Sequence, residues 1–240
     1  MSLPKFFVEN LPQNGEITIS EADARHLLVV LRGQPGEIIT VCDGKGLEAE
    51  CELVSTDGKK AAARIINILK STGELGTTVD LYPSLSRGER FEWMLAKAVE
   101  LGAASITPIL SARCVATAPD AKKLERWQKL SREAAMQSKR AIVPEVKPCA
   151  RFAEALAAAR GAKVFCYEEE TRLLLSAYLR AGIPGAISVM TGPEGGYEPN
   201  EARLAQQHGW ALVSLGGRVL RCETAPAAVL AAIMALSGEM

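Results

Sequence analysis

Two glycine-rich segments late in the chain are the strongest candidates for chemistry. They are residues 191–197 (TGPEGGY) and residues 215–224 (LGGRVLRCET). Each follows a run of residues typical of a strand and precedes a helical pattern. Ligands of open α/β sheets bind at the carboxyl ends of strands, and glycines let the backbone approach a ligand closely. The two segments therefore predict one ligand pocket, with two ordinary tight turns as the alternative.

The charged residues of these segments indicate what the pocket could do. Glu194, Arg218, Arg221 and Glu223 suit binding and charge stabilisation without a metal. The first segment lacks the GxGxxG spacing of dinucleotide-binding loops, and the chain contains no GxxxxGKS or GxxxxGKT phosphate-binding loop. A nucleotide-phosphate enzyme that uses the first segment as an anion cradle is disfavoured, because Glu194 would repel phosphate.

Hydrolytic and metal chemistry find little support. No GxSxG motif is present, and neither His26 nor His208 has neighbours that suggest a catalytic triad. The six cysteines are scattered without a CxxC motif, and only the two histidines could join them as ligands. We therefore expect no metal site and no disulfide framework. Buried thiols are expected for the cysteines, and capping or surface roles for both histidines.

An alternation of strand-like and helical patterns from Thr78 onward must position these segments. The strand-like runs cover residues 78–83, 105–110, 163–167, 187–191 and 211–215. Helical patterns follow Arg90 up to Gly102 and cover residues 122–138, 151–159, 199–207 and 224–236. Such alternation predicts a parallel sheet covered by helices.

The N-terminal part has a different pattern. Short strands are expected at residues 16–19, 37–42, 48–54 and 60–69, with turns at Asp43-Gly44 and Asp57-Gly58 between them. A small β-barrel is the natural closure. One short helix, capped by Ser20, is expected to bury Leu27, Leu28 and Leu31. The loop at residues 71–76 predicts a boundary between a first domain, 1–72, and a second, 73–240.

Composition and hydropathy indicate a globular protein. Hydrophobic residues make up 48% and charged residues 23% of the chain. The longest apolar run, residues 225–236, is shorter than the roughly 20 residues that cross a bilayer, and predicts a buried helix. The first residues lack the apolar core of a secretory signal, so a cytoplasmic location is expected.

Charge is balanced over the whole chain but not locally. There are 28 basic and 28 acidic residues, which gives a net charge of zero. Between Lys122 and Arg140, seven bases stand against Glu125 and Glu133, an excess of five positive charges. This stretch predicts contact with nucleic-acid phosphates, and a solvated helix face is the alternative.

Taken together, the motifs resemble those of one family. The two glycine-rich segments closely resemble the paired C-terminal signatures of the RsmE family, the 16S ribosomal RNA (uracil N3) methyltransferases. Further likeness covers residues 86–90, 97–102, 113–115 and 133–138, so it spans most of residues 80–240. One departure is Glu198, where a serine or threonine that caps the next helix is expected. Pro199 still favours a helix start.

The resemblance implies an α/β protein with a PUA-like RNA-binding barrel and a C-terminal parallel sheet of the SPOUT class, tied in a trefoil knot, with helices on both faces. It implies a homodimer that binds S-adenosylmethionine and acts on 16S ribosomal RNA, within the small ribosomal subunit. The cofactor would contact Thr191, Gly192, Pro193, Glu194, Gly195, Gly196, Leu215, Gly216, Val219, Leu220, Arg221 and Thr224. RNA would contact Arg87, Arg90, Lys122, Lys123, Arg126, Lys129 and Arg132.

Methylation of uridine N3 requires this nitrogen to lose its proton, so the enzyme must favour the uracil anion. Arg221, which is always charged, is the best placed by sequence to do so. Glu223 or Glu194 could take the proton, although an ordinary glutamate is a weak base; helix capping and loop bracing are the alternative for both. A SPOUT relative that methylates a ribose 2′-hydroxyl or a transfer RNA base, and a non-catalytic RNA-binding module, remain the competing hypotheses.

Overall fold

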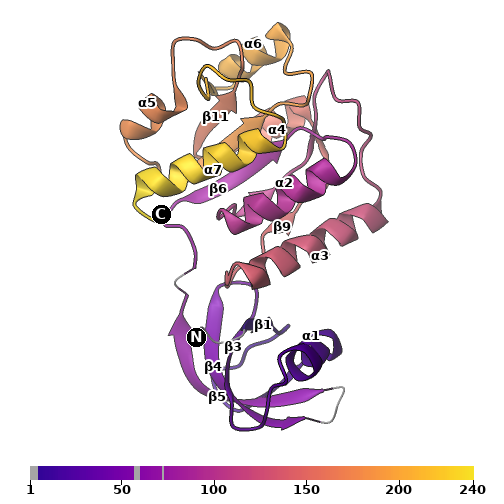
Figure 1. The fold of residues 1–240 in the computed structure, drawn as a ribbon. Helices are drawn as coiled ribbons and strands as arrows, with labels where there is room; N and C mark the ends of the chain where they lie inside the picture. The colour runs from indigo at the N-terminus through magenta and orange to yellow at the C-terminus, as the bar shows by residue number, and fades with distance from the viewer. Residues whose placement is uncertain (1–4, 57–59, 72) are drawn as a thin grey trace. The chain divides into compact units, whose positions relative to one another are not determined.

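The computed structural model describes residues 5–56, 60–71 and 73–240, and its elements are drawn in Figure 1. The chain forms two compact units. The first contains residues 1–74 together with 135–143, and the second contains residues 75–134 and 144–240. The grouping of residues 135–143 with the first unit has no counterpart in the sequence pattern.

The first unit is a five-stranded sheet with one short helix. Its strands are β1 (Lys5–Phe7), β2 (Glu16–Ile19), β3 (Ile38–Cys42), β4 (Leu47–Thr56) and β5 (Ala61–Lys70). The order is β1-β3-β4-β5-β2, with β1 parallel to β3 and the other pairs antiparallel. The four predicted strands are confirmed. The barrel is confirmed only as a sheet, because no pairing of β1 with β2 closes it within the residues described.

Local signals explain the turn and the helix of this unit. The Asp43 carboxylate accepts hydrogen bonds from the backbone N–H of Lys45 at 2.7 Å and of Leu47 at 3.0 Å, which fixes the predicted turn. The turn predicted at Asp57-Gly58 lies outside the described residues. Ser20 Oγ accepts a hydrogen bond from the Asp23 backbone N–H at 3.4 Å, as expected of a cap.

The apolar face predicted for this helix is wrong in part. The α-helix α1 (Glu21–Arg25) continues as a π-helix η1 (His26–Val30), whose wider turn changes the spacing of side chains. As a result Leu27 is buried, whereas Leu31 is 45% exposed. Leu27 packs into a core formed by alternate residues of the strands, among them Ile39, Val41 and Leu53.

Several contacts hold residues 135–143 to the rest of the first unit, among them a hydrogen bond from Lys5 Nζ to the Lys139 carbonyl at 2.7 Å and those of Glu74. The Glu74 carboxylate pairs with Arg140 at 2.6 Å and accepts the backbone N–H groups of Ala141 and Ile142 at 3.0 and 2.9 Å. Arg140 is therefore buried and its charge is matched. It does not belong to the exposed basic surface that the charge count had suggested.

The second unit is a parallel α/β structure. Its main strands are β6 (Thr78–Pro83), β7 (Ser105–Ile106), β9 (Glu145–Val146), β11 (Ala162–Cys166), β12 (Ala186–Thr191) and β13 (Ala211–Val213). They form a parallel sheet in the order β13-β11-β12-β6-β7-β9. Two further strands, β8 (Ile109–Leu110) and β10 (Ala150–Arg151), pair with each other.

Helices surround this sheet, as predicted. They are α2 (Glu89–Glu100), α3 (Ala121–Gln137), α4 (Phe152–Ala158), α5 (Leu175–Arg180), α6 (Pro199–Gln207) and α7 (Thr224–Ser237). Tyr82 of β6 and Met190 of β12 pack in one cluster with residues of α4 and α6. Their neighbours Leu81 and Val189 are also buried, and since successive strand residues point to opposite faces, both faces of the sheet are covered.

Two predictions about this unit need correction, and one helix was missed. The strand expected at residues 105–110 is divided into β7 and β8, because Pro108 cannot donate a ladder hydrogen bond. The strand expected at residues 211–215 ends at Val213. Helix α5 was not predicted; it has six residues, and only Leu175 and Leu179 are buried on it.

The very apolar segment 225–236 is a helix, as expected. Its buried residues within α7 are Pro226, Val229, Leu230 and Ile233. The helix ends at Gly238, whose φ of 79° is the left-handed conformation of a C-terminal cap. Among the helices that the structure describes, none is long and apolar enough to span a membrane.

Candidate active site

Both glycine-rich segments emerge at the same edge of the main sheet. The first loop follows β12, which ends at Thr191, and the second follows β13, which ends at Val213. Strand β11 lies between these two strands, so the loop after Cys166 emerges at that edge as well. Because carboxyl ends of parallel strands meet there, the site is built from three loops, of which the sequence predicted two.

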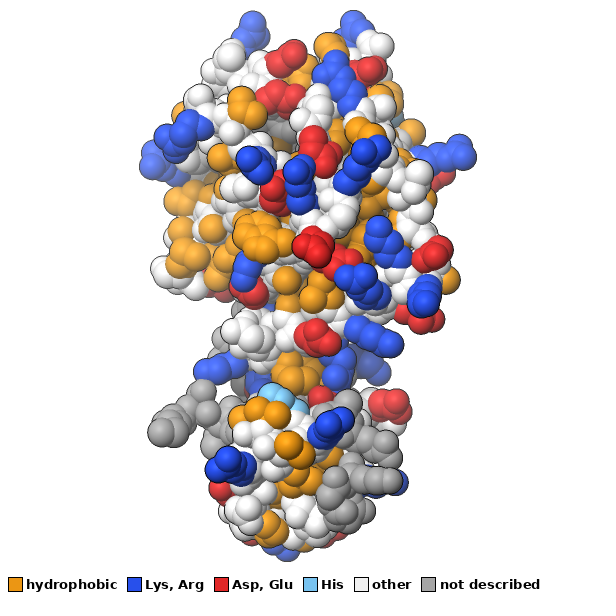
Figure 2. Space-filling view, turned by 45° about the vertical axis from the view of Figure 1, so that its right-hand side comes forward, with side chains coloured by type: hydrophobic (Ala, Val, Ile, Leu, Met, Phe, Trp, Pro, Cys, Tyr) orange, Lys and Arg blue, Asp and Glu red, His pale blue; other side chains and the backbone are white. Residues whose placement is uncertain are grey.

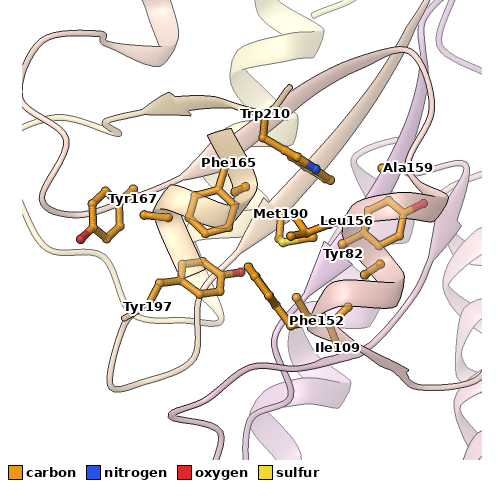
Figure 3. Close-up of a cluster of buried hydrophobic side chains, with 13 residues drawn as sticks. Tyr82, Ile109, Phe152, Leu156, Ala159, Phe165, Tyr167, Met190, Tyr197 and Trp210 are labelled. Carbon is orange, nitrogen blue, oxygen red and sulfur yellow. The ribbon is translucent and has the colours of Figure 1, made fainter. Parts of the chain in front are cut away.

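A buried aromatic anchor holds the first loop on the sheet. The ring of Tyr197 lies 4.3 Å from that of Phe165 and 5.8 Å from that of Phe152, measured between centroids (Figure 3). Its hydroxyl accepts a hydrogen bond from Ser84 Oγ at 3.3 Å, and Ser84 Oγ also lies 3.2 Å from Ser111 Oγ. Burial raises the pKa of Tyr197 well above its ordinary value, so the anchor is neutral.

The loop after β8 braces the first loop from the side. Arg113 donates a hydrogen bond from Nη1 to the Gly195 carbonyl at 3.0 Å. Glu201 of α6 accepts the backbone N–H of Ala112 at 2.8 Å and that of Glu198 at 2.9 Å. Glu198 and Glu201 thus form a capping box, in which each side chain faces the backbone N–H of the other residue, and α6 begins at Pro199 as predicted.

The glycines differ in what they contribute. Gly196 has φ +67°, and a Cβ there would lie 1.6 Å from Glu168 Oε1 in the loop after β11. A Cβ on Gly195 would meet the Arg113 side chain, at 3.4 Å from its Cβ and 3.5 Å from its Cδ, which are ordinary contacts. Gly216 has φ +109°, and a Cβ there would meet no described atom within 4 Å. Gly196 therefore permits close packing of two loops, whereas Gly216 leaves open space beside the second loop.

The predicted cofactor residues meet one test of a ligand site. Thr191 is 1% exposed, and its buried Oγ1 has no hydrogen-bond partner within the described part of the chain. Buried hydroxyls are normally paired. An unpaired hydroxyl at the end of β12, with open space beside Gly216 and Gly217, fits a ligand that has polar groups and contacts backbone.

Glu194 joins the first loop to the start of α2. Its Oε1 accepts the backbone N–H of Arg87 at 3.4 Å and lies 3.8 Å from Arg90 Nη1. Both arginines are exposed. The contacts match the bracing role that was the alternative to proton transfer for this residue.

Glu223 stands at the cap position of α7. Burial by itself raises the pKa of its carboxyl, but a hydrogen bond from its own backbone, one from the Cys222 thiol, and the charges of Arg90 and Arg221 lower it overall. The Cys222 Sγ lies 3.2 Å from Glu223 Oε2. A carboxylate with a lowered pKa is a poor acceptor of a proton from uracil, so bracing is favoured here too.

Arg221 is exposed in the second loop. Its carbonyl accepts the backbone N–H groups of Thr224 and Ala225 at 2.9 and 3.0 Å, which begins α7. Val219, two residues earlier, is 90% exposed. The structure thus brings Arg221, Glu223, Glu194 and Arg90 to one region, linked by the charges that act on Glu223.

The predicted RNA-binding bases of α3 are exposed, apart from the half-exposed Arg132. Arg126 pairs with Glu92 at 2.5 Å, and Lys123 Nζ lies 5.2 Å from the centre of the Trp127 ring. On the face drawn in Figure 2, basic side chains are scattered among acidic and hydrophobic ones. Contact with RNA phosphates would therefore be made by several separate lysine and arginine side chains, not by one continuous basic patch.

Three site residues were not assigned a role from sequence: Arg113, Glu168 and Glu201. Arg113 and Glu168 follow the ends of strands β8 and β11, so the rule that ligand loops follow strand ends would have found them. The contact of Glu201 depends on the packing of α6. No group of three or more potential metal ligands occurs in the described residues.

Comparison with known proteins defines the class. A family described as RNA methyltransferase domain matches residues 74–234, and one described as RNA methyltransferase PUA domain matches residues 19–66. With the parallel sheet and its loops, these matches define an RNA methyltransferase of the SPOUT type that carries an N-terminal PUA domain.

The particular family follows from individual relatives. Ribosomal RNA small subunit methyltransferase E of Bacillus subtilis is 34% identical over 96% of this chain and 96% of its own length. That of Synechocystis is 36% identical, over 92% and 73%. A crystal structure of the Neisseria gonorrhoeae enzyme bound to S-adenosyl methionine has 36% identity and a TM-score of 0.89, covering 98% of each chain. The chain belongs to the ribosomal RNA small subunit methyltransferase E (RsmE) family.

Proposed function

We propose that this protein transfers a methyl group from S-adenosylmethionine to N3 of one uridine in the 16S ribosomal RNA of the small ribosomal subunit. The observation that carries the proposal is the pair of glycine-rich loops, with an unpaired buried hydroxyl at Thr191 and open space beside Gly216. The printed name of the relatives and the cofactor bound to the Neisseria enzyme support it.

The two loops and the residues that flank them would hold the cofactor, which supplies an activated methyl group when bound. Thr191 Oγ1, at the end of β12, can form a hydrogen bond with the ligand. The backbone at Gly216 can approach the ligand closely because no side chain intervenes. The proposed set is Thr191, Gly192, Pro193, Glu194, Gly195, Gly196, Leu215, Gly216, Val219, Leu220, Arg221 and Thr224.

Arg221 would stabilise negative charge on the uracil oxygens as N3 loses its proton. Its guanidinium is exposed, and Glu223 beside it keeps a negative charge because its pKa is lowered. We therefore assign Glu223 to orienting Arg221 and Glu194 to joining the first loop to α2. Solvent then takes the N3 proton, which requires no carboxyl with a raised pKa.

The trefoil knot is part of this proposal. Strand β12 lies inside the sheet between β11 and β6, and β13 returns to the far side of β11. The first and second loops leave strands on both sides of β11, an arrangement compatible with one loop passing through the other. The resemblance to the RsmE family also supports the knot.

RNA binding would be shared by both domains, residues 1–72 as a PUA-like barrel and residues 73–240 as the methyltransferase. The match of residues 19–66 to a PUA domain of RNA methyltransferases supports RNA binding by the N-terminal domain. Exposure of Arg87, Arg90 and the bases of α3 supports RNA binding by the methyltransferase domain. A ribosomal substrate implies that the enzyme works in the cytoplasm.

We also propose a homodimer that uses α7. This helix is almost wholly apolar, yet several of its alanines are only partly buried and Leu236 is 40% exposed. Such a helix has more apolar surface than one sheet face covers. Light scattering at micromolar concentration should give twice the chain mass of 25.7 kDa, and the mass of one chain would contradict the dimer.

Transfer of a labelled methyl group tests the function. Small ribosomal subunits isolated from cells that lack the enzyme should accept the label from S-adenosylmethionine, and large subunits should not. Absence of transfer, together with absence of S-adenosylmethionine binding in calorimetry, would favour a non-catalytic RNA-binding protein. Transfer to transfer RNA would favour a different SPOUT activity.

A further inference from the structure

One tryptophan has no role in the core. The chain has three tryptophans. Trp127 and Trp210 are 1% and 2% exposed, whereas Trp93 is 48% exposed. Helix α2 is held on the protein by its other side, where Phe91, Met94 and Leu95 are buried. Trp93 therefore leaves 48% of a large apolar side chain in water, and this area is available to a ligand.

Trp93 borders a hollow that the second glycine-rich loop helps to form. The hollow is lined by Glu89, Arg90 and Trp93 of α2, and by Glu223 and Thr224 at the start of α7. The charges of Arg90 and of Arg221 both act on Glu223. The indole thus lies in the same region as the cation proposed for the methyl-transfer step.

We propose that Trp93 is a stacking platform for a nucleobase of the RNA substrate, and that this hollow is a base-binding subsite. The inference rests on the proposed function only in taking the ligand to be the RNA that the enzyme methylates. Every base has a π face that stacks on an indole ring. Arg90 on the rim can pair with a phosphate, and the carboxylates of Glu89 and Glu223 can accept hydrogen bonds from base N–H groups.

The surroundings of Trp93 favour a base over a second copy of this chain. One turn away on α2 lie Glu89, Arg90 and Lys97, all of them charged, and Ala96. The centres of protein interfaces are depleted in charge. A nucleotide, in contrast, combines an apolar ring face with polar edges and a phosphate, which matches an indole set among charges.

The test compares Trp93→Phe, Trp93→Leu and Trp93→Ala in the full-length protein with S-adenosylhomocysteine bound. Fluorescence anisotropy of an end-labelled oligouridylate gives the RNA affinity. Phenylalanine keeps a stacking face and should stay within about threefold of wild type, while alanine should lose about 10-fold or more. Leucine keeps apolar area without a π face, so it should resemble alanine. Tyr178→Ala on α5 is the matched control for loss of a ring.

An abasic oligonucleotide of the same length, which has the sugar-phosphate backbone but no bases, should bind the wild type and Trp93→Ala with equal affinity. Equal oligouridylate affinity for Trp93→Ala and wild type would overturn the proposal, and so would a leucine variant that binds as well as phenylalanine. A Trp93→Ala protein that becomes monomeric would assign the ring to a dimer contact instead. These outcomes are separate from the proposed function, whose failure would be a wild-type enzyme that binds RNA but transfers no methyl group.

Discussion

At the scale of single residues, Arg221 carries the chemical proposal. Replacing it with alanine should lower turnover by on the order of 10²-fold, roughly 3 kcal/mol, because one preorganised charge stabiliser is lost. Arg221→Lys should recover little, since lysine lacks the planar fork. Higher pH should partly restore the alanine variant, because hydroxide then supplies the uracil anion.

Single-turnover kinetics at saturating cofactor measure this directly, with Arg180→Ala, an exposed arginine on α5, as the control. An Arg221→Ala enzyme with a normal rate of methyl transfer but weak cofactor binding would contradict a chemical role for Arg221. Arg221 would then brace the second loop.

Glu223 makes a prediction about pH. The pKa of its carboxyl is lowered from 4.5 in the folded protein. A depressed folded-state pKa means that the carboxylate stabilises the fold above the unfolded value, and that this contribution is lost as pH falls through the folded value. Glu223→Gln should therefore unfold at a lower temperature than wild type at neutral pH, and the difference should fade below about pH 4.

Thermal unfolding across that range measures the effect. The pH dependence of methyl transfer provides a second readout: Glu223→Gln should retain the rise in rate with pH. If that rise disappears, Glu223 is the base that accepts the N3 proton and the bracing role is wrong.

At the scale of elements, the contact between the first loop and the loop after β11 depends on Gly196. Its φ of +67° disfavours a side chain, and a Cβ would overlap Glu168. Gly196→Ala should cost about 1–2 kcal/mol in stability and weaken cofactor binding. Gly185→Ala, just before β12, is the control for an added methyl group, because its Cβ would meet no described atom within 4 Å.

Thermal unfolding measures the effect on stability, and titration calorimetry measures the effect on cofactor affinity. Adding Glu168→Ala to Gly196→Ala should recover only the stability lost through overlap of the new Cβ with Glu168. The loss caused by the positive φ at residue 196 should remain. If the single Gly196→Ala variant matches Gly185→Ala in stability and cofactor affinity, the two loops do not depend on Gly196.

The sequence predicted elements best where a periodic pattern had clear end signals. Strand β6 and helix α6 begin and end as expected, and α6 begins at Pro199, directly after its cap residue Glu198. Short elements such as β1 and α5 were missed because three and six residues are too few to show a period. In the candidate site, glycines indicated both loops that we propose hold the cofactor, whereas the roles of Arg113 and Glu168 depend on which strand ends meet in the folded sheet.

At the scale of the molecule, the basic stretch at residues 122–140 divides into two kinds of residue. Lys129 is exposed, while Arg140 is buried against Glu74. Lys129→Ala should leave stability unchanged and reduce the dependence of RNA affinity on salt by roughly one ion. Arg140→Ala should cost about 3 kcal/mol in unfolding free energy, because the partly buried Glu74 carboxylate loses its ion partner.

Denaturant unfolding and RNA binding at several salt concentrations separate these effects. A Lys129→Ala protein with an unchanged salt dependence would remove this residue from the RNA surface. An Arg140→Ala protein as stable as wild type would mean that the remaining contacts, such as the hydrogen bond from the Val143 N–H to the Gly44 carbonyl, hold residues 135–143 without the ion pair.

The central claim is that the product is a uracil methylated at N3. Small ribosomal subunits from cells without the enzyme are incubated with the protein and S-adenosylmethionine, their RNA is digested to nucleosides, and the nucleosides are identified by mass spectrometry. The account predicts one new methylated nucleoside, N3-methyluridine, which is absent when Arg221→Ala replaces the wild type at short times. A ribose 2′-O-methylated nucleoside, or a methylated base other than uracil, would contradict it.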